Sequence, residues 1–65
     1  MAEWIAMAVG KMHIYKITQT ELAARLGIRR DYLNKVLAGT FAPKGMEERV
    51  LAAIDEIVAE RQRTA

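Results

Sequence analysis

The stretch that decides the fold is ITQTELAARLGIRRDYLNKVLAG, residues 17–39, in which two short apolar-periodic segments flank Gly27. Arg29, Arg30 and Asp31 follow this glycine almost at once. A single amphipathic helix that only covers a core needs neither a break in its middle nor two arginines where it restarts. The pattern therefore predicts two helices, of which the second is displayed to an anionic partner while the first holds it in place.

The first of these helices has clear start and stop signals. Thr18 can cap it, and Glu21, three residues later, completes a Thr-x-x-Glu capping box. Ile17 before the cap and Leu22 in the first turn can close a hydrophobic staple. Gly27 ends the helix, because a left-handed backbone is least costly without a Cβ.

The second helix is predicted over about residues 29–38. Leu33, Val36 and Leu37 are expected to face the core, and Gly39 to end the helix. The polar side chains that fall on the opposite side are Arg30, Asp31, Asn34 and Lys35.

Two flanking helices are predicted around this pair. The first carries an apolar stripe of Trp4, Ile5, Ala8, Val9 and Met12 and should end near residues 13–15. Gly10 within it indicates either close packing or early fraying. The last helix, over about residues 46–62, has a stripe of Val50, Leu51, Ile54, Ile57 and Val58. This stripe is wide enough for a core alone or for a core and a homodimer interface, and periodicity does not decide between them.

Length and composition restrict the class of protein. A chain of 65 residues with 52% apolar residues fits one small domain, residues 1–65. With no cysteine and a single histidine, His13, no metal site, catalytic site or cofactor is expected, and the protein is not predicted to be an enzyme. The absence of a long apolar run or a signal-like start predicts no membrane association and a cytoplasmic location.

Charge is distributed unevenly along the chain. Residues 1–17 carry a net +1, residues 18–45 a net +3 and residues 46–65 a net −2. Positive charge is thus concentrated around the glycine break. This concentration indicates an anionic partner there, although a solvated surface gives the same pattern.

The segment TQTELAARLGIRRDYLNKVLAGT resembles the phage-repressor and Cro-type helix-turn-helix family. The match covers about residues 18–39, a third of the chain, and the whole sequence is similar in character to small phage-associated regulators. The resemblance implies an all-α, lambda-repressor-like fold, a compact bundle of about four helices with a central helix-turn-helix. It also implies binding to a double-stranded DNA operator, without a small-molecule substrate.

The resemblance assigns DNA contacts to particular positions. Gln19 would brace a phosphate and a recognition-helix side chain, the helix over about residues 29–38 would enter the major groove, and the following loop would touch phosphates. The implied DNA-binding residues are Gln19, Arg29, Arg30, Asp31, Tyr32, Asn34, Lys35, Thr40 and Lys44.

The chemistry of these residue types agrees with the assignment. Arginine can pair with O6 and N7 of guanine, asparagine with adenine, and a carboxylate such as Asp31 can accept from cytosine or orient an arginine. Tyr32 could reach DNA or pack against the first helix of the motif. Phe41, in the following loop, is expected to be buried in the core between the third and fourth helices, as a core plug that joins them.

The sequence therefore predicts a small transcriptional regulator, cytoplasmic and nucleoid-associated, that binds specific duplex sequences. A homodimer through the last helix would suit an operator with repeated half-sites. The alternative is a helical protein-protein adaptor in which the same basic face meets an acidic protein surface.

Overall fold

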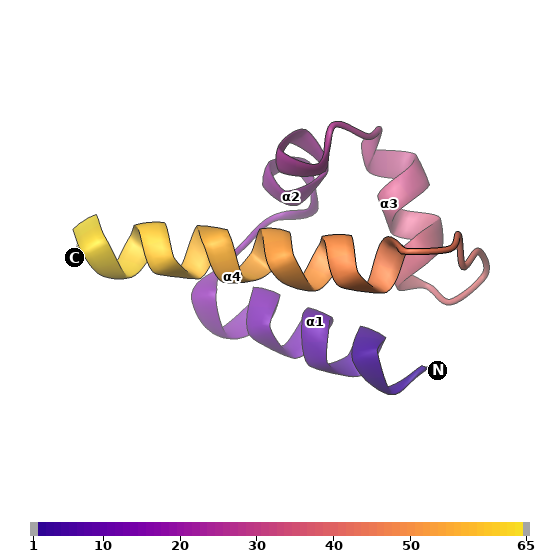
Figure 1. The fold of residues 1–65 in the computed structure, drawn as a ribbon, viewed down its shortest axis with the longest axis horizontal. Helices are drawn as coiled ribbons and strands as arrows, with labels where there is room; N and C mark the ends of the chain where they lie inside the picture. The colour runs from indigo at the N-terminus through magenta and orange to yellow at the C-terminus, as the bar shows by residue number, and fades with distance from the viewer. Residues whose placement is uncertain (1, 65) are drawn as a thin grey trace.

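The chain folds as four α-helices in a computed structural model that describes residues 2–64. The helices are α1 (Glu3–Tyr15), α2 (Gln19–Leu26), α3 (Arg30–Leu37) and α4 (Met46–Thr64). Helix α4 runs along the molecule, with α1 on one side of it and α2 and α3 on the other (Figure 1). The predicted all-α bundle of about four helices is confirmed, and no strand occurs between residues 2 and 64.

The core lies where these helices converge. Its largest fully buried side chains come from α2, α3 and α4, and they are Leu22, Leu33, Val36, Val50, Ile54 and Ile57. Ile5, Ala8 and Met12 of α1 are also buried. Every buried residue within the described range is apolar, so the polar residues are left at the surface.

Of the two hydrogen bonds of the predicted capping box at the start of α2, only the one to Thr18 forms. Thr18 Oγ1 accepts a hydrogen bond from the Glu21 backbone N–H at 3.0 Å. The Glu21 carboxylate does not reach back to the cap, however, because it accepts from Arg61 of α4 at 2.7 Å. The Glu21 side chain therefore contacts α4 and does not take part in capping.

The turn between α2 and α3 depends on the predicted glycine. Gly27 has a left-handed backbone with φ of 73°, and the Ile28 N–H donates back to the Ala23 carbonyl at 3.0 Å. Only Gly27, Ile28 and Arg29 separate the two helices. This short connection fixes the direction of α3 relative to α2.

Helix α1 ends at Tyr15, within the predicted range, but its apolar stripe is narrower than expected. Val9 is 43% exposed, so its assignment to the core was wrong. It lies on the flank of the helix, where it borders a surface hollow. Gly10 has open space beside it and the helix continues past it, so neither close packing nor fraying explains this residue.

The loop after α3 differs from the prediction at Phe41. Gly39, with φ of 81°, turns the chain, and the Thr40 N–H donates to the Lys35 carbonyl at 3.2 Å. Phe41 then points outward and is 45% exposed, so the predicted core plug is wrong. Met46 at the start of α4 is buried instead.

The wide stripe of α4 is largely covered within one chain. Val50, Ile54 and Ile57 are buried, and Leu51 and Val58 are half-buried against the same core. Helix α4 thus offers little free apolar surface to a second copy. In the range 2–64, none of the helices has the length and apolar character required to cross a membrane.

Candidate nucleic-acid interface

Helix α3 divides cleanly into a buried and an exposed face. Leu33, Val36 and Leu37 are buried, as predicted. The exposed polar side chains, which we call the α3 ridge, are Arg30, Asp31, Asn34 and Lys35. The four side chains project from one short helix that α2 and the core hold in place.

Arg29 precedes this helix as its N-terminal cap and not as its first residue. Its backbone is extended and its side chain makes no capping hydrogen bond. Arg29 Nε lies 3.5 Å from Asp31 Oδ1, but the two side chains are 87% and 72% exposed. Solvent screens such a pair strongly, so Arg29 can exchange Asp31 for another anionic partner.

Gln19 lies beside the α3 ridge. A hollow of about 340 Å³ is lined by Gln19, Arg30, Asp31 and Asn34. The start of α2 and the start of α3 thus contribute side chains to the same surface. This arrangement places one amide side chain next to a cation, an anion and a second amide.

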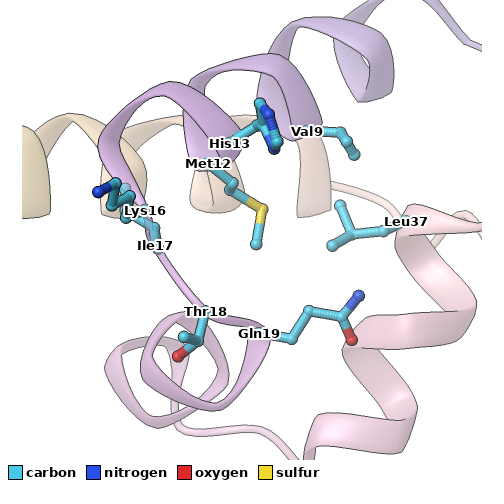
Figure 2. A pocket seen from close by; sticks show the side chains of 8 residues that line it. All are labelled: Val9, Met12, His13, Lys16, Ile17, Thr18, Gln19 and Leu37. Carbon is cyan, nitrogen blue, oxygen red and sulfur yellow. The ribbon is translucent and has the colours of Figure 1, made fainter.

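A second, more apolar hollow of about 550 Å³ adjoins the first at Gln19. It lies between the end of α1, the start of α2 and the end of α3 (Figure 2). In this view Met12 and Leu37 point into the gap, whereas Lys16 points away from it. Its lining residues are Val9, Met12, His13, Lys16, Ile17, Thr18, Gln19 and Leu37.

The remaining predicted contacts lie in the first turn of α3, at Tyr32, and in the loop after the helix, at Thr40 and Lys44. Tyr32 is half-buried and packs against the core, whereas Thr40 and Lys44 are exposed. The Thr40 hydroxyl donates to the Lys35 carbonyl at 3.1 Å, so it helps to end α3. A phosphate contact from this hydroxyl would require that hydrogen bond to break.

Arg25 was counted with the positive charges around the glycine break, but its guanidinium is paired with carboxylates of α4. Its Nη1 and Nη2 donate to the two carboxylate oxygens of Glu60, each at 2.6 Å, and Nη1 also lies 3.4 Å from Glu56. These hydrogen bonds hold the pKa of Glu60 below its ordinary value and raise the pKa of Arg25. The spacing of Glu56 and Glu60, one helical turn apart, was the only sequence signal for this pairing.

Exposed cations without an internal side-chain partner occur in α3 and the loop after it, and within residues 2–64 Lys16 and Arg63 are in the same state elsewhere. Within residues 2–64, the side chains of Arg30, Lys35 and Lys44 form no ion pair or hydrogen bond. His13 is exposed, and across the same residues no three His, Cys, Asp or Glu side chains are grouped to hold a metal ion. The side chains of Arg30, Lys35 and Lys44 are thus exposed without a partner in the described part of the chain.

Comparison with protein-family models, with curated proteins and with solved structures found no match for this chain.

Proposed function

We propose that this protein binds double-stranded DNA sequence-specifically, as a small phage-type transcriptional regulator. The observation that carries the proposal is the contrast between Arg25, which α4 neutralises, and the exposed Arg30 and Lys35, which no residue in the range 2–64 pairs. Exposed Lys and Arg side chains without an internal partner can neutralise phosphates and release the counterions condensed on DNA, which favours binding to the DNA backbone.

Helix α3 is the proposed reader of base edges. An α-helix fits the major groove, where an arginine can donate two hydrogen bonds to guanine and an asparagine can pair with adenine. Arg30 at the start of the helix and Asn34 one turn later are the proposed base readers. Asp31 would orient Arg29 or accept from a cytosine amino group.

Backbone contacts would set the register of the helix in the groove. Lys35 and Lys44 can contact phosphates as point charges without reading sequence. Gln19, at the start of α2, would bridge a phosphate and the α3 ridge across the 340 Å³ hollow. The N–H groups of Gln19 and Thr20, at the start of α2, would also suit an anion, whereas the Glu21 N–H already donates to Thr18.

Regulation would follow from occupancy of an operator near a promoter, which blocks or recruits polymerase. A protein with this role would lie on the nucleoid in the cytoplasm. A homodimer would allow binding to repeated half-sites, with its contacts outside the largely covered stripe of α4.

The test is fluorescence anisotropy with labelled duplexes, first of mixed sequence at low and moderate salt and then of sequences selected from a random pool. Binding should be salt-sensitive, and selection should yield a preferred sequence. Arg30→Ala should cost about 1–3 kcal/mol on the selected duplex and relax the preference at one base pair. Arg63→Ala is the matched control, because Arg63 is an exposed arginine near the end of α4.

The alternative, a protein-binding adaptor, is favoured by one observation. Helix α1 leaves Met7 52% and Ile14 71% exposed, and their spacing of seven residues places them on the same side of the helix. If the protein bound no duplex at either salt concentration, the DNA-binding proposal would be wrong and the adaptor would be favoured.

A further inference from the structure

The exposed surface beside the α3 ridge contains an aromatic pair. The rings of Tyr32 and Phe41 lie with their centroids 5.2 Å apart and their planes at 85°, an edge-to-face arrangement. Tyr32 is half-buried against the core, whereas Phe41 is 45% exposed. The pair therefore has an anchored inner ring and an outer ring that presents apolar surface to solvent.

The position of this pair follows from helical geometry. Tyr32 lies next to Lys35 on the surface of α3, because residues three apart are neighbours, and it lies on the side of Lys35 away from Asn34. Phe41 extends this edge outward. The ridge is thus flanked by the Gln19 hollow on one side and by an aromatic edge on the other.

The loop geometry holds Phe41 at this edge. Gly39 turns the chain at the end of α3, and both the N–H and the hydroxyl of Thr40 donate to the Lys35 carbonyl, at 3.2 and 3.1 Å. These two hydrogen bonds fix the residue immediately before Phe41 against the last turn of the helix. The exposed ring is consequently held in place and is not the end of a free loop.

We infer that Phe41, supported by Tyr32, contacts the C5 methyl group of a thymine at the edge of the binding site and contributes to sequence preference. The inference rests on the proposed DNA-binding function. A phenyl ring has neither a charge nor a hydrogen-bond donor to offer a phosphate. The thymine methyl group is the apolar feature of the base edges in the major groove, and phenylalanine is suited to contact it. An apolar ring beside a basic helix therefore selects for thymine.

The experiment uses the duplex selected by the full chain and a set of duplexes in which each thymine in turn is replaced by deoxyuridine, which lacks the methyl group. For the wild-type protein, one such replacement at the edge of the site should weaken binding about fourfold, the loss of one buried methyl group at about 0.8 kcal/mol. Phe41→Ala should bind the thymine duplex about fivefold or more weakly and should no longer distinguish thymine from deoxyuridine at that position.

Two controls separate this effect from folding. Phe41→Leu keeps an apolar side chain and should retain part of the discrimination. Ile14→Ala removes an exposed apolar side chain from α1 and should change neither binding nor discrimination. Circular dichroism should show that both Phe41 variants keep the helical content of the wild type, since Phe41 is not part of the buried core.

The outcomes distinguish the two proposals. If the wild type binds no duplex, the proposed function fails, and the thymine contact fails with it. If the wild type binds a selected duplex but Phe41→Ala binds it equally well, or loses affinity equally for thymine and deoxyuridine at every position, the thymine contact alone is overturned.

Discussion

Arg61 Nη2 lies 2.7 Å from Glu21 Oε1, and Nη1 of the same guanidinium donates to the Tyr15 carbonyl at 2.8 Å. One side chain of α4 thus contacts both the end of α1 and the first turn of α2. This contact replaces the second half of the capping box and connects the helix that supports α3 to the longest helix of the bundle.

Replacing Arg61 should therefore destabilise the fold. Arg61→Met keeps the apolar stem but removes both donors, and the free energy of unfolding should fall by about 1 kcal/mol, because the contacts are only partly shielded from solvent. Thermal unfolding followed by circular dichroism measures this change. Arg63→Met, two residues later and exposed, is the control and should leave the midpoint within experimental error. An equal loss of stability in both variants would contradict the role of the two Arg61 contacts.

Acidification should weaken the bundle through Glu60. Because the two hydrogen bonds from Arg25 hold the folded-state pKa of Glu60 below its ordinary value, the pair stabilises the fold fully above the ordinary carboxylate range. That contribution is lost as the pH falls through the lowered folded-state pKa. Arg25 stays protonated throughout and does not contribute to the dependence.

The measurement is the unfolding midpoint as a function of pH, from neutral down to about pH 2–3. Glu60→Gln should be less stable than the wild type at neutral pH and should lose less stability on acidification. Asp55→Asn is a control, since the Asp55 contact with Lys11 is 3.3 Å long and its carboxylate is 67% exposed. If Glu60→Gln kept the full pH dependence, another carboxylate would be responsible for it.

Lys16 has a backbone conformation that a lysine adopts at a cost. It has φ of 57°, in the left-handed region, and follows α1 at the place where helices commonly end in glycine. Lys16→Gly should raise the free energy of unfolding by about 0.5–1 kcal/mol. Glycine removes the steric cost of a Cβ in the left-handed conformation, and the greater conformational freedom of glycine in the unfolded chain offsets part of this gain. Urea unfolding measures the gain. Lys16→Ala removes the charge but keeps the Cβ, so a similar gain in that variant would contradict the backbone explanation.

The salt dependence of DNA binding should identify Lys44 as a phosphate contact. Lys44→Ala should weaken binding to selected and mixed sequences alike and reduce the slope of log K against log salt by about one. The measurement is a salt titration of anisotropy on both duplexes. A loss confined to the selected sequence would make Lys44 a base reader instead.

Most of the fold could be predicted because its signals are local. Thr18, Gly27 and Gly39 each act within a few residues of their position in sequence. The structure has the expected cap hydrogen bond at Thr18 and the expected positive φ values at Gly27 and Gly39. The inward face of α3 was predictable for the same reason, since periodicity along one helix distinguishes its two sides.

What the sequence could not show depends on contacts between distant residues. Arg25 and its partner Glu60 are 35 residues apart, so nothing near Arg25 indicated that its charge was already balanced. The prediction for Phe41 was wrong because it rested on the general preference of aromatic side chains for burial. The direction of the loop after Gly39 decides where the Phe41 ring lies, and it leaves the ring exposed. The hollow beside Gln19 likewise depends on how α2 and α3 cross.

The division of α3 into two faces has a consequence for how this protein can change. Its buried residues hold the bundle together, whereas Arg30, Asn34 and Lys35 make no side-chain hydrogen bond or ion pair within residues 2–64. Exchanging these three outward side chains therefore leaves the scaffold intact. Under the proposed function, a few codon changes at these positions would give the same framework a preference for a different DNA sequence.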